Sequence, residues 1–264
     1  MHFYKDIYQV RRLTMKFYAN MKILVCLSVV PDTTTKITFT ENDTRFNTTG
    51  VTWIMNPYDE MALTRALELT EQLTGSVTTI TVGLADTEAV IRKALAVGAT
   101  DAVRINAAPI DALQVASEIV NFAKSENYDL IFTGRESIDY NGGLVAGLIG
   151  ELMSIPSINV VTKIELNNQI AKLERDIDGG REVMECSLPL VLSAQKEFAE
   201  PRIPNMRGIM AARTKPLKVI EGQSSNSTQV SKFELPKAKS GVKMIAIENA
   251  NELIGLLHNE AKVI

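Results

Sequence analysis

One glycine-containing segment has the residue types expected of a nucleotide-binding loop. Residues Thr133–Gly143 (TGRESIDYNGG) follow an apolar run and lead directly into a helical pattern. Gly142 and Gly143 would let the backbone approach a ligand closely, and the free N–H groups of the following helix favour a phosphate. Asp139 and Asn141 could accept hydrogen bonds from a ribose, or they could cap the helix. A capped strand-to-helix turn that uses Gly for positive φ explains the same residues, so the pattern leaves both interpretations open.

The absence of two common nucleotide-binding motifs and the small number of histidines limit the kinds of site that the chain can contain. The chain contains neither G-x-x-x-x-G-K-[ST] nor G-x-G-x-x-G, so the loop indicates nucleotide binding better than nucleotide hydrolysis. The two histidines, His2 and His258, lie at opposite ends of the chain. A histidine-based catalytic triad or a His/Cys zinc site is therefore close to excluded.

A group of carboxylates surrounds a second pair of glycines. Asp176, Asp178 and Glu182 flank Gly179-Gly180, where a metal or acid/base site is conceivable. Asp-Gly-Gly between two strand-like runs is more typical of a hairpin turn, and the pattern favours the turn.

The segment Glu197–Arg213 combines bulky apolar residues, two prolines and basic residues. Its apolar side chains are Ile203, Met206, Ile209 and Met210. Between residues 202 and 219 there is no acid, and the basic residues are Arg202, Arg207, Arg213, Lys215 and Lys218. Apolar and basic side chains together in a long loop suit a protein-docking surface, and Met adapts to variable partners. A covered loop with its Met residues in the core is the alternative.

The elements that must position these residues alternate between strand and helix. Strands are predicted at Met21–Val30, Thr78–Leu84, Ala102–Ile105 and Tyr128–Thr133, and helices at Pro57–Leu73, Thr87–Val97, Ile110–Ser125 and Leu144–Met153. This alternation predicts an open α/β fold, with a mainly parallel sheet and helices on both faces. Ligands bind such sheets beyond the carboxyl ends of the strands, near the point where the strand order reverses.

The pattern changes after Pro156. Strand-like runs separated by turn residues follow at Ile158–Leu166, Ile170–Ile177, Glu182–Ser187 and Leu190–Ala194. We expect them to form an antiparallel extension of the same sheet. The Thr/Asn-rich stretch Thr35–Thr48 predicts an excursion or hairpin.

Three parts are expected along the chain. Residues 1–20 form an N-terminal extension outside the fold, residues 21–220 form the α/β domain, and residues 221–264 form a linker and a C-terminal arm. The stretch 232–247 has too few apolar residues for a core of its own, so we expect it to lie on a partner. A short helix is predicted at residues 249–259.

Composition limits the class of protein. With 264 residues, of which 45% are hydrophobic and 22% charged, the chain can bury a sizeable core. A net charge of -3 disfavours nucleic-acid binding. Two Cys fit a reducing, cytoplasmic compartment. The apolar run Ile23–Val30 is too short to span a membrane, so no membrane insertion is expected; a signal-peptide core is its alternative interpretation, and a buried first strand is favoured.

Residues 21–220 resemble the beta subunit of electron transfer flavoproteins. Four segments carry the resemblance: Met55-Asn56-Pro57, Ile91–Ala99 (IRKALAVGA), Glu174–Gly180 (ERDIDGG), and Glu200-Pro201-Arg202 with Ile209-Met210. Between them, Asp139–Pro156 follows the family's nucleotide loop and helix in register. Each segment is weak alone, but their order and spacing are specific.

The resemblance implies the non-catalytic half of a heterodimer in electron transport, an electron carrier and not an enzyme. In the family, the alpha subunit carries the redox FAD, and the beta subunit holds AMP in an adenine-nucleotide-binding α/β fold. The AMP contacts carried over by the resemblance are Cys26, Asn56, Val82, Gly134, Asp139, Tyr140, Asn141, Gly142, Gly143, Leu144 and Val145.

The resemblance also implies two protein contacts. Arg202–Ala211 matches the family's recognition loop for acyl-CoA dehydrogenases, the flavoenzymes of fatty acid oxidation. The docking residues implied are Glu200, Pro201, Arg202, Met206 as anchor, Ile209 and Met210. Asp176 falls where the family has an acidic residue that contacts the mobile FAD domain of the alpha subunit.

Two departures from the family lower the affinity expected for AMP. Leu144 replaces a usual Gln, which removes a hydrogen bond worth about 0.5–1.5 kcal/mol, and Tyr140 replaces a usual Gly and adds bulk near the phosphate. An alternative remains open: in electron-bifurcating members of the family, the beta subunit holds a second FAD that accepts hydride from NADH.

Overall fold

The computed structural model of the chain describes residues 20–238 and 241–264. The expected extension at residues 1–20 therefore lies outside the described residues, apart from Asn20. The described chain forms two compact units, residues 20–38 with 47–230 and residues 39–46 with 231–264. Residues 221–230, which the sequence predicts as the start of a linker, belong to the first unit.

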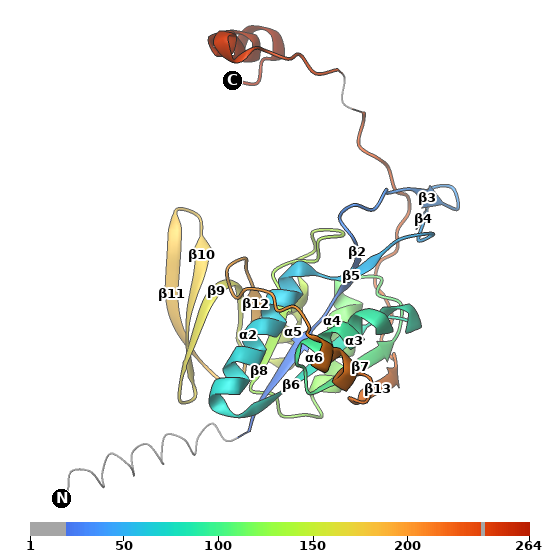
Figure 1. Cartoon of the computed structure of the whole chain (residues 1–264), viewed down its shortest axis with the longest axis vertical. Coiled ribbons are helices and arrows are strands. Elements are labelled where there is room, and N and C mark those ends of the chain that lie inside the picture. Colours follow the sequence, from blue (N-terminus) through green and yellow to red (C-terminus); the bar gives the residue numbers. More distant parts are fainter. Residues whose placement is uncertain (1–19, 239–240) are drawn as a thin grey trace, which may run out of the picture. The chain divides into compact units, whose positions relative to one another are not determined.

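The first unit is built on an open nine-stranded sheet with the order β11-β10-β9-β12-β8-β1-β6-β7-β13 (Figure 1). Its strands are β1 Met21–Cys26, β6 Gly75–Val82, β7 Asp101–Asn106, β8 Leu130–Gly134, β9 Ser157–Asn167, β10 Ile170–Ile177, β11 Gly180–Ser187, β12 Leu190–Ala194 and β13 Leu217–Glu221. All neighbouring strands from β9 to β13 pair in parallel, whereas β10 and β11 are antiparallel. The predicted α/β class with a mainly parallel sheet is confirmed.

Two strands differ from the sequence prediction. β12 is not part of an antiparallel extension, because it inserts between β8 and β9 and pairs in parallel with both. Every residue of β12 is buried, as a strand with neighbours on both sides and helices on both faces requires. β13 was not predicted; it is a short strand after Pro216 whose only neighbour in the described chain is β7, at the sheet edge.

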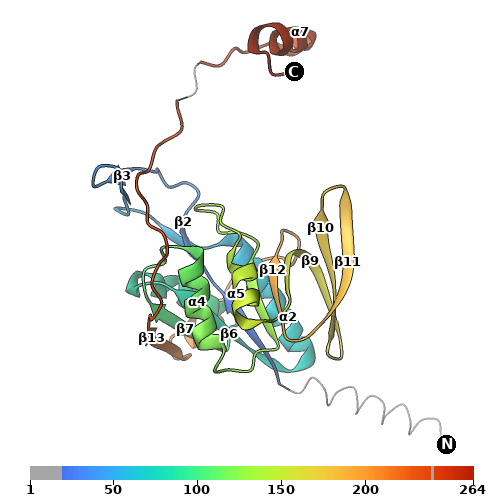
Figure 2. The same ribbon diagram turned by 180° about the vertical axis from the view of Figure 1, so that it is seen from behind.

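The helices cover both faces of the sheet. α2 Pro57–Leu73 and α3 Glu88–Val97 lie on the face seen in Figure 1, with the one-turn 3-10 helix η1 Ala85–Thr87 before α3. Figure 2 shows α4 Ala112–Ala123 and α5 Val145–Met153 on the opposite face. These four helices confirm the predicted pattern to within a few residues. Gly98, with a φ of 148°, follows the last residue of α3, as expected of a helix stop.

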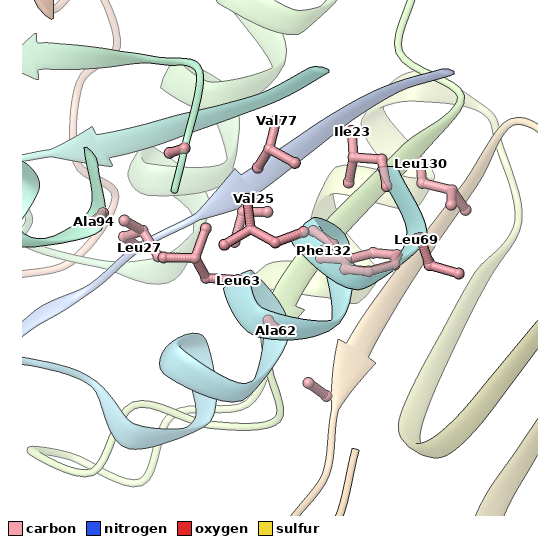
Figure 3. Close-up of a cluster of buried hydrophobic side chains, with 14 of the residues drawn as sticks. Ile23, Val25, Leu27, Ala62, Leu63, Leu69, Val77, Ala94, Leu130 and Phe132 are labelled. Atoms are coloured by element: carbon pink, nitrogen blue, oxygen red, sulfur yellow. The ribbon is translucent and has the colours of Figure 1, made fainter. Parts of the chain in front are cut away.

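The alternation of buried side chains along β1 explains why both faces are covered. Ile23 and Val25 belong to the core beneath α2 and α3, whereas Leu24 and Cys26 belong to the core beneath α4 and α5. Figure 3 shows the first of these cores, where Leu63 of α2 lies near Leu27 and Val25, and Leu69 of the same helix lies near Phe132. Since both faces of β1 are apolar, the strand has to be central in the sheet.

The predicted strand Met21–Val30 is interrupted. β1 ends at Cys26, and β2 Val29–Pro31 leaves the main sheet to pair with β5 Trp53–Met55. At the break, the Leu27 N–H donates to the Ile80 carbonyl and the Ser28 N–H donates to the Asp59 carboxylate. The chain therefore turns away after Leu27, which still bonds the backbone of β6, at the point where the Asp59 side chain becomes the acceptor for the Ser28 N–H.

The second unit contains the predicted hairpin. β3 Phe39–Thr40 pairs with β4 Arg45–Phe46, and the Phe39 ring stacks on Phe233 at 4.9 Å between centroids. The Phe233 N–H also donates to the Asp43 carbonyl over 2.7 Å.

A helical segment ends the second unit. The 3-10 turn η2 Ile247–Asn249 precedes α7 Ala250–Gly255, and a π-helical stretch, η3 Leu256–Ala261, follows it. The short helix predicted at residues 249–259 is confirmed. In the described chain, no helix combines the length and the apolar character that crossing a membrane requires.

Candidate functional site

A cleft of about 310 Å³ opens at the carboxyl ends of β1, β6 and β8. From β1 the chain moves outward through β6 and β7 on one side, and it then returns to place β8 on the other side. The cleft therefore lies at the point where the strand order reverses, the position expected for a ligand site in an open parallel sheet. The N-terminal ends of α4 and α5 form its other walls.

The structure brings most of the predicted nucleotide-binding residues together. Nine of them line this cleft: Cys26, Asn56, Val82, Gly134, Asp139, Tyr140, Gly142, Gly143 and Val145. Asn141 and Leu144 do not. Asn141 occupies a turn with a φ of 53°, and Leu144 is 68% exposed at the start of α5.

Asn56 precedes α2 in sequence, but its side chain does not cap that helix. Its amide nitrogen donates to the Glu136 carbonyl over 2.8 Å, and its amide oxygen accepts from the Ile138 N–H over 3.4 Å. Asn56 is 1% exposed. It therefore fixes the loop after β8 to the start of α2, and this loop forms part of the cleft wall.

Asp59, in the first turn of α2, is the functional residue that sequence reasoning missed. It is 2% exposed, and its two carboxylate oxygens accept from the Ser28 N–H at 2.6 Å and the Gly134 N–H at 2.8 Å. It therefore joins the ends of β1 and β8 at the floor of the cleft. A Cβ on Gly134 would overlap an Asp59 carboxylate oxygen, so this position needs glycine. Acids are common in the first turn of any helix, and the sequence carries no signal that marks this one.

Burial raises the pKa of Asp59 to about 7, although the two N–H donors act in the opposite direction. A carboxyl whose folded-state pKa is raised stabilises the protein most at low pH, and this stability is lost as the pH rises from about 4 to about 7.

Asp59→Asn is therefore expected to flatten the pH dependence of stability. Between about pH 5 and pH 7.5, the native chain should lose about 2–3 kcal/mol of unfolding free energy that the variant keeps. The variant itself should be less stable at pH 5, because its NH2 group faces one of the two N–H donors, whereas the hydroxyl oxygen of the protonated Asp59 carboxyl can still accept a hydrogen bond. Denaturant unfolding of the full chain at the two pH values measures both effects. Glu185→Gln, on the exposed side of β11, is the control, and an equal pH slope in all three proteins would contradict the assignment.

Two further acids at the rim are held by N–H donors. Asp111 caps α4 by accepting from the Gln114 N–H at 2.8 Å, and it also accepts from the Ser227 and Thr228 N–H groups. These bonds lower the pKa of Asp111 to about 2. Asp139 accepts from the Ser137 hydroxyl and from the Tyr140 N–H at 2.8 Å.

Cys26 contributes packing to the cleft, not reactivity. It is 6% exposed at the end of β1, and burial raises the pKa of its thiol far above the ordinary value, with the Asp59 charge as a second cause. The thiol form is neither a nucleophile nor a metal ligand at neutral pH. Cys26 is thus suited to packing against a ligand and not to acting as a nucleophile.

The predicted docking loop contains a short helix, α6 Met206–Ala212, which the sequence analysis did not foresee. The Asn205 side chain begins it by accepting from the Gly208 N–H at 2.8 Å. Met206 is 74% exposed and Met210 is 56% exposed, so the alternative with both Met residues in the core is wrong. Ile203 and Ile209 are exposed as well.

Three of the five basic residues between 202 and 219 contact the fold, and one of them, Lys218, lies 5.9 Å from the ring centroid of Phe122 in α4. Arg202 pairs with Glu71 of α2 through bonds of 2.6 and 2.9 Å, and the Lys215 ammonium donates to the Leu95 and Ala99 carbonyls at the end of α3. Arg207 and Arg213 are exposed and form no ion pair with any described residue. The basic surface around α6 is therefore smaller than the sequence count suggests.

The remaining predicted contacts lie apart from the cleft lining. Glu200 and Pro201 are exposed ahead of α6. Asp176 pairs with Arg181 across the β10–β11 hairpin at 3.3 Å, and its side chain is 42% exposed. Asp178 and Gly179 form the tight turn of that hairpin, with a φ of 86° at Gly179. Among the described residues, no cluster of three His, Cys, Asp or Glu could hold a metal ion.

Comparison with known proteins places the chain in one family. The family model described as "Electron transfer flavoprotein domain" matches residues 43–224. The electron transfer flavoprotein subunit beta of Bacillus subtilis is 35% identical over 259 residues, covering 92% of this chain and 100% of that protein. The subunit of the same name from Syntrophomonas wolfei is 34% identical, covering 85% and 90%, and the human one is 29% identical, covering 93% and 100%.

Proposed function

The chain belongs to the electron transfer flavoprotein family as a beta subunit, and on this premise we propose that it binds AMP in the cleft and docks acyl-CoA dehydrogenase-type flavoenzymes through α6. Membership carries a role in electron transport, and a beta subunit implies an alpha subunit as partner. In this proposal the alpha subunit carries the redox FAD of the complex.

The cleft geometry is the observation that carries the nucleotide assignment. A volume of about 310 Å³ suits a ligand of mononucleotide size, and the lining is apolar at β1, β6 and α4 and polar at the loop before α5. Val82 and Val115 supply apolar walls for a base, while Asp139 at the opposite loop supplies an acceptor for ribose hydroxyl groups. As at any helix start, the first backbone amides of α5 have no intrahelical acceptor, and they suit a phosphate.

The α6 surface supports the docking role. Met206 and Met210 on α6, and Ile203 just before it, are exposed apolar side chains, and Arg207 and Arg213 are exposed in the same segment. Hydrogen bonds from Arg202 to Glu71 of α2 and from Arg92 of α3 to the Ala212 carbonyl attach this segment to the fold. Apolar anchors next to basic side chains are typical of a protein interface, and a surface held by the fold loses little entropy on binding.

The nucleotide content of the complex tests this function. The full chain co-expressed with the alpha subunit should release one FAD and one AMP per heterodimer on heat denaturation. Chromatography of the released nucleotides identifies and counts them. Two FAD and no AMP would contradict the proposal and favour the bifurcating alternative, in which this chain's own FAD accepts hydride from NADH.

A further inference from the structure

The walls of the cleft carry negative charge and no positive charge. Four acidic side chains line it, Asp111, Glu136, Asp139 and the partly ionised Asp59, whose pKa burial raises to about 7, and the lining contains no Lys, Arg or His. Sites that bind phosphate strongly generally combine backbone amides with a cationic side chain or a metal ion. Here the side chains repel the phosphate that the start of α5 could hold.

The carboxylates also occupy backbone donors that a phosphate would otherwise use. In an open parallel sheet, the amides just beyond the carboxyl ends of the strands are placed to bind anions. Asp59 already accepts from the amides of Ser28 and Gly134, and Asp139 accepts from the amide of Tyr140. The amides left for a ligand include those of Gly142 and Gly143 and the short run at the start of α5, where neither Leu144 nor Val145 offers a polar side chain.

Arg135 is the basic residue that directly follows a cleft residue in the sequence, and its side chain contacts residues outside the cleft lining as well as Glu136. Arg135 follows Gly134, but its guanidinium lies 5.8 Å from the ring centroid of Tyr58, donates to Gln195 and pairs with Glu136 at 3.3 Å. Arg135 does not line the cleft. Its charge therefore offsets that of Glu136 without contacting the ligand volume.

From these observations we propose that the cleft is a low-charge site, in which the adenosine part of the ligand supplies nearly all the affinity and every phosphate beyond the first weakens binding. This inference rests on the proposed function, since it concerns the same cleft. It predicts a ranking that an ordinary phosphate site would not give, with adenosine close to AMP, ADP weaker, and ATP weaker still.

Titration calorimetry on the nucleotide-free heterodimer with adenosine, AMP, ADP and ATP tests the ranking. We expect dissociation constants for adenosine and AMP within about 3-fold of one another, and ADP weaker than AMP by about 10-fold. Raising the salt concentration from about 0.05 to about 0.5 M should tighten ADP binding, because salt screens the repulsion. Adenosine binding should not change.

Removing the charge of one cleft carboxylate tests whether electrostatic repulsion or the shape of the cleft weakens the binding of phosphates. Glu136→Gln keeps the size of a half-buried side chain, and the Glu136 carbonyl that accepts from Asn56 belongs to the backbone. This variant should bind AMP and ADP about 3-fold more tightly and adenosine unchanged. Glu185→Gln, an exposed acid on β11 outside the cleft lining, should change none of them.

The outcomes distinguish this inference from the function on which it rests. AMP binding about 10-fold or more tightly than adenosine, or ADP binding as tightly as AMP, would overturn the low-charge site and leave the nucleotide function standing. Equal affinities of Glu136→Gln and the native protein for ADP would also overturn it. No binding of any of the four compounds would overturn the nucleotide function itself.

Discussion

Removal of residues 231–264 is expected to abolish a stable heterodimer with the alpha subunit. These residues bury little against themselves, and Val242, Met244 and Ile247 are 81%, 86% and 90% exposed. Each such side chain contributes about 1.5–3 kcal/mol when a partner covers it. Losing all of them should weaken association by several orders of magnitude. Co-purification from cells that express both subunits, followed by analytical ultracentrifugation, measures the effect.

Point variants within residues 231–264 distinguish the loss of apolar contacts with the alpha subunit from the loss of the segment itself. The double variant Met244→Ser with Ile247→Ser should raise the dissociation constant by about 100-fold, because two exposed apolar groups are lost while the backbone remains. Lys237→Ser shortens a side chain in the same arm without removing an apolar anchor, so it should associate normally. A heterodimer of native affinity after complete removal of the arm would refute its role in assembly.

Met206→Ala is expected to reduce electron transfer from an acyl-CoA dehydrogenase by about 10- to 100-fold at limiting concentrations of the dehydrogenase. Met206 is 74% exposed at the start of α6, so its truncation costs the fold little, whereas an anchor buried at an interface contributes about 1.5–3 kcal/mol. The loss should appear as a higher KM for the dehydrogenase, with unchanged FAD content. Steady-state reduction of the complex at varied dehydrogenase concentration measures it.

Two further variants serve as controls for this prediction, one on the opposite face of the sheet and one that displaces α6 without changing its apolar side chains. Leu113→Ala truncates a side chain 40% exposed on α4, on the opposite face of the sheet, and should leave the KM unchanged. Gly208→Ala alters no exposed apolar side chain, but its Cβ would overlap the Ala96 carbonyl of α3 and displace α6. Gly208→Ala should therefore also raise the KM. A native KM for Met206→Ala would remove α6 from the docking surface.

Local sequence patterns were sufficient wherever neighbouring residues decide the structure. The apolar period and the Asn56-Pro57 start predicted the bounds of α2, and Asp178-Gly179-Gly180 predicted the turn between β10 and β11. The segments that resemble the beta-subunit family are likewise short and contiguous, and the family comparison confirms the assignment. Helical period, turn chemistry and family motifs are short-range properties, and the sequence displays them directly.

Long-range contacts decided the features that the sequence did not predict. From the sequence, β12 was expected to be one more strand of the antiparallel extension. In the structure it is buried on both faces and lies between β8 and β9. The sequence predicted Lys215 as one of several basic surface residues. In the structure its ammonium group donates to carbonyl groups at the end of α3, more than a hundred residues earlier in the chain.

The candidate site divides in the same way. The sequence by itself determined the family, the α/β class and most residues of the loop before α5. Only the tertiary structure decided that Asp59 lies beneath that loop, bonded to Gly134 across 75 residues, and that four carboxylates face one cleft without a cation. The physical reason is that the charge of a site is a sum over side chains from separate elements, which meet only when strands far apart in sequence pair in one sheet.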